Sequence, residues 1–189
     1  MEEIEVKFLD VNKTEIENKL KALGAELVSS NIQHSKSFDF EDKRLADKYS
    51  WVRLREQEGK VTLAYKERLG VSDNSLKDKG MKEIEINVSE FENTEKLLDA
   101  LGLIPKFYEE KRRTTYVLDS VTCDIDEWPL IPPYLELEGS SIDELKSVAK
   151  KLDLPWEESC MCSAMQVFEK HGIDENSFSV LTFDKQIKK

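Results

Sequence analysis

Charged and apolar side chains alternate at the start of this sequence, in a pattern that could serve chemistry. Glu3, Glu5 and Lys7 occupy every second position, and Ile4 and Val6 stand between them. In an extended chain successive side chains point to opposite faces, so the three charged groups would share one face. Two interpretations are open: a half-buried strand with a solvated outer face, or a charged face that looks into an enclosed site.

The same period of two recurs later in the chain, where one face again collects the charged groups. The bases on this face are Lys7, Arg53, Arg55, Lys66, Lys111 and Arg113. The acids on it are Glu3, Glu5, Glu83, Glu85, Asp124, Asp126, Glu136 and Glu138. The opposite face of the same stretches is largely apolar, which indicates strands with one buried side.

Bases and paired carboxylates on one face have a specific chemical use. Lysine and arginine neutralise phosphate oxygens, and the arginine fork can bind two of them. Carboxylates repel phosphate, but they bind Mg²⁺ or Mn²⁺, which coordinates phosphate oxygens on its other side. Each Glu-x-Glu pair would hold two carboxylates about 7 Å apart on one face. The pattern therefore predicts a site for a metal-bound polyphosphate.

The overall composition narrows the function classes. The chain has 189 residues, of which 35% are charged, and its formal net charge is -11. This charge opposes long-range attraction to nucleic acid or anionic membranes, so we expect neither as a partner. We expect a single domain over residues 1–189. Because no apolar run approaches the roughly 20 residues of a membrane span and the N-terminus lacks a secretory signal, we expect a cytoplasmic protein.

Cysteine and histidine are scarce in this chain. Cys123, Cys160 and Cys162 cannot all pair with one another, and the last two have the wrong spacing for a zinc knuckle, so we expect reduced structural thiols. With only His34 and His171, a histidine-rich metal site or a Ser-His-Asp arrangement is hard to build. A bound metal should therefore be a hard cation on carboxylates.

Amphipathic helices and short strands would position the charged residues. Helical spacing of apolar residues predicts helices within residues 12–24, 89–103, 140–154 and 157–172. Alternation predicts strands over residues 3–8, 32–40, 49–56, 60–67, 81–88, 109–118, 121–128 and 134–139. The tight turns between most of them require antiparallel pairing. Residues 68–80 are polar and too long for a hairpin turn, and form either an insertion or a mobile cover.

Two architectures fit these elements. In an open sheet, helices would cover the apolar face and water would cover the charged face. In a closed barrel, the apolar face would turn outward under the helices, and the charged face would line an interior that can hold one small ligand. In both, Trp128 and Trp156, each beside a proline, are predicted to be packing residues.

The order of the motifs resembles the CYTH domain family, also called the triphosphate tunnel metalloenzymes. EIEVK is similar to the Glu-x-Glu-x-Lys signature of that family, and SFDFEDKRLADKYSWVRLRE is similar to its Tyr/Phe-Asp segment and Arg-x-Arg strand. LAYKE, KEIEI, EEKRRTTY and CDIDEWPLIPPYLELEG follow in the order of the later strands. The resemblance covers residues 2–139 well and the remainder more loosely, and a tyrosine common near the end of such chains has no counterpart in CSAMQVFEKHG.

The resemblance implies an α+β fold, in which an eight-stranded antiparallel closed barrel forms a tunnel and helices pack outside it. It implies that the triphosphate is bound by Lys7, Arg53, Arg55, Lys66, Lys111 and Arg113. Catalytic roles are expected for Lys66, Arg55 and Glu5. Metal-binding roles are expected for Glu3, Glu5, Asp126, Glu136 and Glu138. Glu83, Glu85 and Asp124 share the charged face, where they either bind metal or orient the bases.

The resemblance leaves the reaction open, because the family includes triphosphatases and class IV adenylyl cyclases. We expect a triphosphatase that uses Mg²⁺ or Mn²⁺ and acts on tripolyphosphate, thiamine triphosphate or a nucleoside triphosphate, as a monomer or homodimer. The alternative is a cyclase that converts ATP to cyclic AMP and pyrophosphate. A third hypothesis is a module that binds polyphosphate or a nucleotide without turnover.

Overall fold

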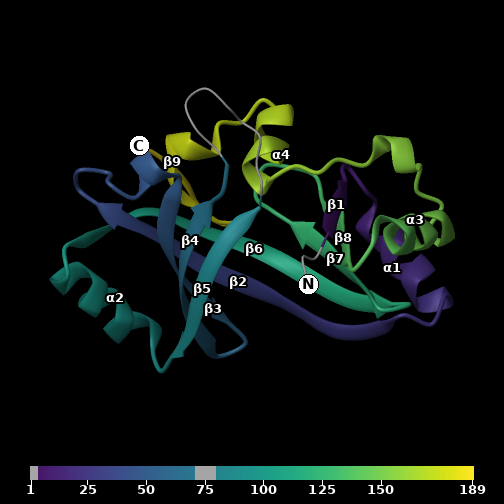
Figure 1. Ribbon diagram of the computed structural model, residues 1–189, viewed down its shortest axis with the longest axis horizontal. Coiled ribbons are helices and arrows are strands. Elements are labelled where there is room, and N and C mark those ends of the chain that lie inside the picture. The colour runs from purple at the N-terminus through teal and green to yellow at the C-terminus, as the bar shows by residue number, and fades with distance from the viewer. Residues whose placement is uncertain (1–3, 71–79) are drawn as a thin grey trace. The chain divides into compact units, whose positions relative to one another are not determined.

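The computed structural model describes residues 4–70 and 80–189 as an α+β fold (Figure 1). The helices are α1 (Lys13–Ala22), α2 (Phe91–Ala100), α3 (Ile142–Lys151) and α4 (Ala164–Lys170). The strands are β1 (Ile4–Phe8), β2 (Glu26–Phe40), β3 (Ser50–Gln57), β4 (Lys60–Arg68), β5 (Met81–Val88), β6 (Leu103–Leu118), β7 (Val121–Glu127), β8 (Tyr134–Gly139), β9 (Phe178–Leu181) and β10 (Gln186–Lys188). None of the helices in these ranges has the length and apolarity needed to cross a membrane. Glu3 and residues 71–79 of the predicted loop lie outside the described residues.

One mostly antiparallel sheet contains all the predicted strands. Its order is β1-β8-β7-β6-β2-β3-β4-β5, and β9 pairs with β6 in parallel. β2 and β6 are longer than predicted, at 15 and 16 residues. The alternation pattern missed β9 and β10, because strands of 4 and 3 residues are too short to show a period.

The prediction of a closed barrel is wrong, because the sheet formed by the described residues does not close. β1 and β5 stand at opposite ends of the strand order, and in the described part of the chain β1 pairs with β8 and β5 pairs with β4. An isolated bridge occupies the outer edge of β1, where Lys7 N donates to Cys160 O at 2.8 Å and Cys160 N donates to Lys7 O at 2.9 Å. These bonds use the backbone groups that a closing strand would need at this position.

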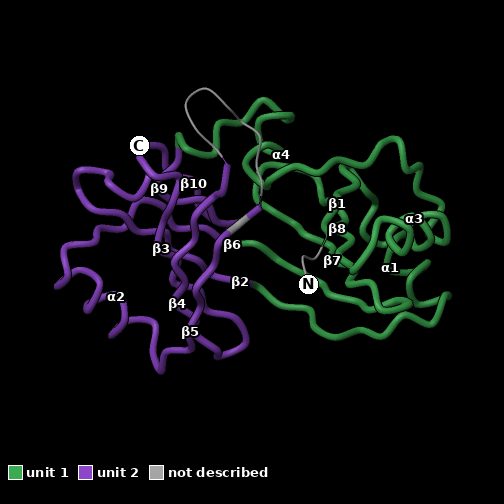
Figure 2. The backbone as a smooth tube through the Cα atoms, viewed as in Figure 1, with its two compact units in different colours: residues 1–32, 111–177 green, residues 33–110, 178–189 purple. Residues whose placement is uncertain are grey.

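The chain forms two compact units, which Figure 2 shows in green and purple. Unit 1 comprises residues 1–32 and 111–177, and unit 2 comprises residues 33–110 and 178–189. Two of the three boundaries fall inside β2 and β6, so each of these long strands contributes to both units, and the third lies just before β9.

Unit 1 has its core between two helices and the apolar face of its strands. Ile16 and Leu20 of α1 are buried, as are Leu145 and Val148 of α3. They pack in one cluster with the apolar strand residues Val6, Phe8, Tyr116, Leu118, Val121, Cys123, Ile125, Leu135 and Leu137. The predicted separation of apolar and charged residues onto opposite faces is confirmed here. The helices cover the apolar side chains, and the charged side chains that alternate with them lie on the other face of the sheet.

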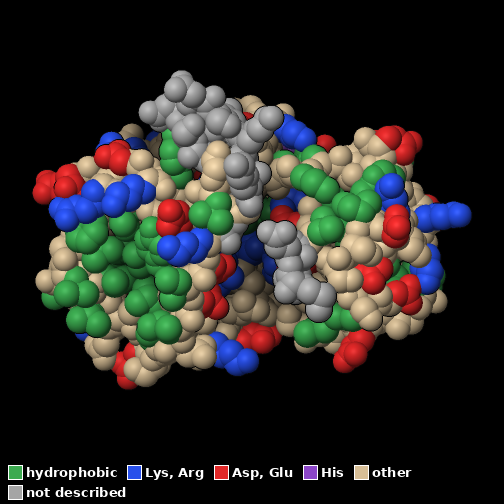
Figure 3. Space-filling model, in the orientation of Figure 1, with side chains coloured by type: hydrophobic (Ala, Val, Ile, Leu, Met, Phe, Trp, Pro, Cys, Tyr) green, Lys and Arg blue, Asp and Glu red, His purple; other side chains and the backbone are tan. Residues whose placement is uncertain are grey.

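Unit 2 packs α2 against the apolar face of part of its sheet. Its core cluster comprises Phe38, Leu54, Val61, Leu98 and Leu103. Ile84 and Ile86 of β5 are both more than half exposed, as are Leu97 and Leu101 of α2. Figure 3 shows hydrophobic side chains gathered on the surface of this unit. The prediction that helices cover the apolar face therefore holds for β2 to β4 and is wrong at β5.

The helix predicted within residues 157–172 is shorter in the structure. Ser163 and Gln166 form a capping box that satisfies the first N–H groups of α4. Cys160 lies before this cap, and its backbone pairs with β1 instead of continuing a helix. Apolar spacing does not reveal this boundary, because pairing with a strand more than 150 residues earlier is a tertiary effect.

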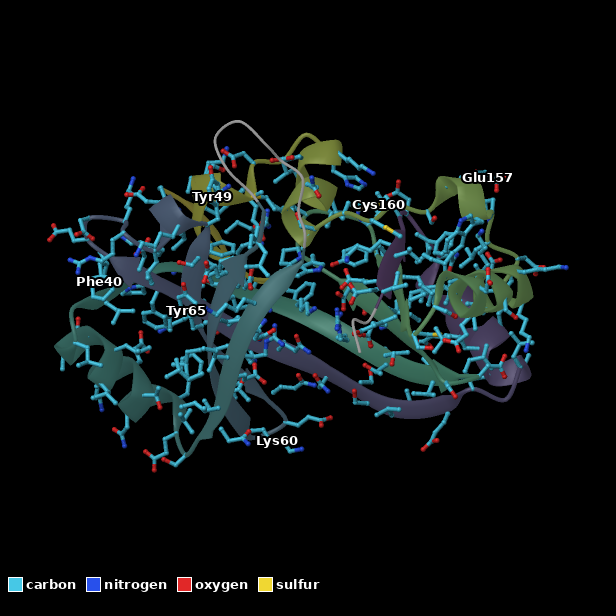
Figure 4. The ribbon with its side chains drawn as sticks, viewed as in Figure 1. Phe40, Tyr49, Lys60, Tyr65, Glu157 and Cys160 are labelled. Carbon is cyan, nitrogen blue, oxygen red and sulfur yellow. A yellow bond between two sulfur atoms is a disulfide. The ribbon has the colours of Figure 1, made fainter. Side chains whose placement is uncertain are left out.

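The cysteines differ in part from their prediction as reduced thiols. Cys160 and Cys162 are joined by a disulfide (Figure 4), and their Cα atoms are 5.4 Å apart, within the range that a disulfide spans. Cys123 is free and buried, as expected of a structural thiol. Burial raises the pKa of Cys123 to about 12, so its thiol stays protonated.

Thiol titration of the denatured protein is expected to detect one thiol, Cys123, before reduction. The same titration after reduction should detect all 3 cysteines. A Cys123→Ala variant is the control, because it should show no thiol until the protein is reduced. Detection of every cysteine without a reductant would contradict the disulfide.

Candidate active site

Acids and bases come together on the charged face of unit 1. Strand register places Lys7 opposite Glu136, and Glu136 opposite Asp124 on its other side. Arg113 lies opposite Asp126 in the β6–β7 pair. We call the charged residues of this face the unit 1 cluster: Glu5, Lys7, Lys111, Arg113, Asp124, Asp126, Glu136 and Glu138.

Asp126 is the most deeply buried acid of the unit 1 cluster, and it binds two bases. Its side chain has no exposed surface. Lys111 Nζ lies 3.0 Å from Asp126 Oδ2, and Arg113 donates from Nε to Oδ1 and from Nη2 to Oδ2 at 2.6 Å each. Burial opposes the ionisation of Asp126, but Lys111 and Arg113 outweigh it and hold the pKa of this carboxyl below its usual range. Asp126 is therefore an anion that orients both bases.

Three carboxylates share the guanidinium of Arg113. Besides Asp126, Arg113 contacts Asp124 Oδ2 at 2.6 Å through Nη1 and Glu136 Oε1 at 3.3 Å through Nη2. Burial works against the charge of Arg113, but these acids raise its pKa well above the ordinary value. Burial raises the pKa of Asp124, although Arg113 and a hydrogen bond from Thr115 act in the opposite direction. The surrounding acids thus fix one orientation of the guanidinium.

Lys7 and Glu5 are the contribution of β1 to the cluster. Lys7 is 3% exposed, and its Nζ lies 2.9 Å from Glu136 Oε2 and also contacts Glu5. Burial raises the pKa of Glu136, but Arg113 and Lys7 outweigh it, so the net shift is downward. The Glu5 side chain is 46% exposed, whereas that of Glu136 is 9% exposed. Glu5 is therefore the more accessible of these two acids.

Glu5 and Glu138 have the donor chemistry that a divalent cation needs. They lie directly opposite each other on antiparallel strands, where two like charges destabilise the sheet. Mg²⁺ and Mn²⁺ favour carboxylate oxygens, so a cation between Glu5 and Glu138 would add to the positive charge that Lys7 already brings to Glu5. Within residues 4–70 and 80–189, no three acidic, histidine or cysteine side chains gather closely enough to hold a metal ion. Asp126 and Glu136 contact bases, as Glu5 does, and their metal-binding roles stay predictions.

Tyr134 and Trp128 support the unit 1 cluster, a role that was not predicted for either residue. Trp128 Nε1 donates to the Tyr134 hydroxyl at 2.9 Å. Lys7 Nζ lies 6.0 Å from the centre of the Tyr134 ring, and Lys111 Nζ lies 5.4 Å from the centre of the Trp128 ring. Rings at these distances attract an ammonium group. Trp128 is thus more than a packing residue. The sequence held one indication of this role: Trp128 is two residues after Asp126, so alternation places both side chains on the same face.

A second set of charged residues, here called the unit 2 cluster, lies on β3, β4 and β5. Arg53 Nη2 is 2.9 Å from Glu83 Oε1 and 3.0 Å from Glu85 Oε2. Lys66 Nζ is 3.0 Å from Glu83 Oε2. Glu83 and Glu85 thus contact bases in this structure, and the choice between orienting bases and binding metal stays a prediction. Arg53 Nε is buried and has no hydrogen-bond partner in the described part of the chain.

Lys66 and Arg55 complete the unit 2 cluster. Burial lowers the pKa of Lys66, the charge of Arg53 lowers it further, and Glu83 acts in the opposite direction. Arg55 lies opposite Ser35 on β2 and Thr62 on β4, so it shares a face with Arg53. The unit 2 cluster therefore holds three bases on one face of the sheet.

The two clusters contain all the predicted site residues except Glu3, which lies outside the described residues. Unit 1 brings together Glu5, Lys7, Lys111, Arg113, Asp124, Asp126, Glu136 and Glu138. Unit 2 brings together Arg53, Arg55, Lys66, Glu83 and Glu85. Within each unit, then, alternation along the strands predicted which side chains share a face.

Comparison with known proteins identifies related chains. The model of the CYTH domain matches residues 1–175. A protein of Methanocaldococcus jannaschii, provisionally named an adenylate cyclase, is 25% identical over 143 residues, which cover 76% of this chain and 79% of that protein.

Solved structures share the fold. The PH1012 protein of Pyrococcus horikoshii OT3 has a TM-score of 0.65 and 26% identity, over 88% of this chain and 99% of that one. A Hippeastrum protein, provisionally called an adenylyl cyclase and described as having a dominant triphosphatase activity, has a TM-score of 0.63 and 17% identity, over 89% of this chain and 95% of that one. At 17% identity, the likeness to the Hippeastrum protein establishes the fold alone.

Proposed function

This chain belongs to the CYTH domain family, and from that premise we propose that it is a divalent-metal-dependent triphosphatase. The proposed reaction removes the terminal phosphate of an inorganic or organic triphosphate. The observation that supports it most is the Arg113 guanidinium, held in place by three carboxylates in the unit 1 cluster. Fixed positive charge of this kind stabilises the charge that develops on a transferring phosphoryl group.

In this proposal the bases of each unit bind phosphate oxygens. The bases are Lys7, Lys111 and Arg113 in unit 1, and Arg53, Arg55 and Lys66 in unit 2. Their contacts with carboxylates orient them before the substrate arrives, so little reorganisation is needed at the moment of reaction. The free Nε of Arg53 supplies a donor that need not be taken from another partner.

Glu5 and Glu138 would hold Mg²⁺ or Mn²⁺, which when bound neutralises charge on the phosphate oxygens. Glu5 is accessible enough to accept a proton from the attacking water. The water oxygen bonds to the terminal phosphorus while the bond from that phosphorus to the bridging oxygen breaks. Orthophosphate and the shortened phosphate chain are then released.

An adenylyl cyclase is the second candidate, favoured by the name given to the Methanocaldococcus jannaschii relative. In that reaction the ribose 3′-oxygen attacks the α-phosphorus of ATP, and pyrophosphate leaves. The same bases would bind the phosphates in both cases. The reaction therefore depends on which phosphorus the nucleophile reaches.

The two candidates differ in their products. The protein is incubated with tripolyphosphate, thiamine triphosphate or ATP, each with Mg²⁺ or Mn²⁺, and phosphate and cyclic AMP are measured separately. We expect orthophosphate from at least one substrate, and loss of that activity when EDTA removes the metal. Cyclic AMP with pyrophosphate would overturn the hydrolase proposal in favour of the cyclase. Tight binding without any product would leave only a binding module, and full activity in EDTA would refute the metal requirement.

The lowered pKa of Lys66 predicts how activity depends on pH. Below this pKa the ammonium group attracts phosphate, and above it the neutral amine does not. Because burial lowers the pKa, we expect kcat/KM for tripolyphosphate to fall at a pH below that at which an exposed lysine loses its proton. Lys66→Arg should move this fall to higher pH, since arginine stays protonated.

The matched control for Lys66→Arg is Lys60→Arg, an exposed position at the start of the same strand. This control should leave the pH profile of kcat/KM unchanged. An identical alkaline limb in Lys66→Arg and the parent protein would exclude Lys66 as its source.

A further inference from the structure

Unit 2 contains a cavity that the proposed activity does not use. It has a volume of about 750 Å³ and is lined by residues of α2, β2, β3, β6 and β9. We call it the α2 pocket. Its volume is within the range of small-molecule sites.

The α2 pocket opens on the opposite side of the sheet from the unit 2 cluster. On β2, Ser35 and Ser37 lie opposite Arg55 and Arg53 and so share their face. Lys36, which lines the α2 pocket, alternates with those serines and points to the other face. The α2 pocket is therefore distinct from the phosphate-binding face.

The α2 pocket already contains one ammonium group, that of the Lys36 side chain. Lys36 Nζ lies 5.6 Å from the ring centres of both Phe91 and Tyr108. The two carboxylate oxygens of Glu95 lie 2.6 and 2.8 Å from the same nitrogen. Two aromatic rings and a carboxylate around one nitrogen are what recognition of an organic cation requires.

The α2 pocket has further carboxylates that a ligand could contact. Glu56 and Glu92 also line it, and neither forms an ion pair with another described residue. The lining carboxylates of Glu56, Glu92 and Glu95 outnumber the lining ammonium groups of Lys36 and Lys106. An anionic ligand would meet this excess of negative charge, whereas a cation would be attracted by it.

One wall of the α2 pocket is a pair of parallel rings. His34 and Tyr108 have ring centres 6.5 Å apart and planes only 10° from parallel. His34 Nδ1 lies 3.2 Å from the Tyr108 hydroxyl and 3.2 Å from Glu110 Oε1, so both contacts hold the ring in place. Such a wall offers a flat apolar surface to the body of a ligand.

We propose that the α2 pocket binds a small organic amine in its cationic form. The ammonium group of the ligand contacts Glu56 and Glu92, and its apolar body lies against the rings of Phe91 and Tyr108. This assignment is independent of the triphosphatase proposal, because it uses none of the residues of the two clusters.

Three ligands with the same phenyl body but different charge test the charge preference. Phenethylamine is cationic, 2-phenylethanol is neutral, and 3-phenylpropionate is anionic at neutral pH. Binding to the full chain is followed by titration with NMR detection. We expect saturable binding of phenethylamine, with a Kd at least tenfold lower than that of either other ligand. No saturation up to about 10 mM, or equal or tighter binding of 3-phenylpropionate, would overturn the proposal.

A variant locates the binding within the α2 pocket. Glu56→Gln combined with Glu92→Gln should raise the Kd of phenethylamine about tenfold, because the remaining lining acid, Glu95, is paired with Lys36 and the rings supply most of the remaining attraction. The matched control is Asp99→Asn, an exposed acid on the same helix outside the pocket. The Kd should not change in this control. Equal Kd values in the double variant and the parent protein would place the amine elsewhere and refute the assignment.

Discussion

Arg113→Gln is expected to lower kcat/KM for tripolyphosphate by about 10²- to 10³-fold, the usual effect of removing one fixed donor that stabilises transition-state charge. Three acids orient the Arg113 guanidinium, and in the proposed reaction this oriented charge stabilises the transferring phosphate group. Glutamine has a polar amide but no charge and no planar fork of donors. Initial rates of phosphate release measure the effect, and thermal unfolding verifies that the variant is folded.

The adjacent residue provides a matched control for this prediction. Arg112 is on the same strand, and its side chain points to the opposite face of the sheet. This side chain is 40% exposed, and its Nη1 lies 3.5 Å from Glu127 Oε1. Arg112→Gln removes the same charge from the chain but not from the unit 1 cluster, so we expect less than a twofold change in kcat/KM. If both variants lost activity equally, net charge rather than the position of Arg113 would explain the loss, and the assignment of Arg113 would be wrong.

Asp126→Asn is expected to lower the free energy of unfolding by about 3–5 kcal/mol, the usual effect of removing one partner from a buried ion pair. The substitution preserves the shape of the side chain but leaves Lys111 and Arg113 without their shared negative charge. Urea denaturation at neutral pH measures the loss. Tripolyphosphate should restore part of it, because an anion that binds only the folded state stabilises that state.

The effect of Asp126 on stability should also depend on pH. The folded-state pKa of Asp126 lies below the usual carboxyl range. Its contribution is therefore complete above the ordinary pKa of an aspartate and is lost as the pH falls through the folded-state value. The difference in unfolding free energy between the parent protein and Asp126→Asn should accordingly be largest near neutral pH and narrow in strong acid.

An exposed ion pair is the control for the buried one. Asp119 contacts Lys151, and their side chains are 51% and 45% exposed. Because such surface pairs contribute about 0–1 kcal/mol, Asp119→Asn should lower the free energy of unfolding by less than about 1 kcal/mol. Similar losses in Asp119→Asn and Asp126→Asn would contradict the view that burial makes the unit 1 cluster sensitive.

The composition of each charged face was predictable from alternation along the strands. Lys7, Glu136 and Arg113 lie in different strands, yet all three have the parity that places them on one face. In paired strands, side chains on the same face of the sheet lie opposite each other. The alternation of charged and apolar residues within each strand is therefore enough to predict which residues share the charged face. Which carboxylate each base binds was not predictable, because a shift of register by two residues preserves parity and changes every pair.

Other features had little or no local signal. Cys160 interrupts a helical pattern because its backbone pairs with Lys7 at the edge of β1. That same pairing occupies part of the edge on which closure of a barrel would depend. Tyr134 and Trp128 were predictable as buried aromatic residues, but their positions beside Lys7 and Lys111 depend on strand register and side-chain packing.

The sequence by itself determined the secondary structure of most strands, the family, and the identity of the charged residues, because these follow from local periodicity and from motif order. The tertiary structure decided that Arg113 is held by three acids, that Asp126 is fully buried, and that a separate aromatic pocket lies under α2. These features depend on distances between residues far apart in the chain, which are set by strand register and packing and not by any local pattern.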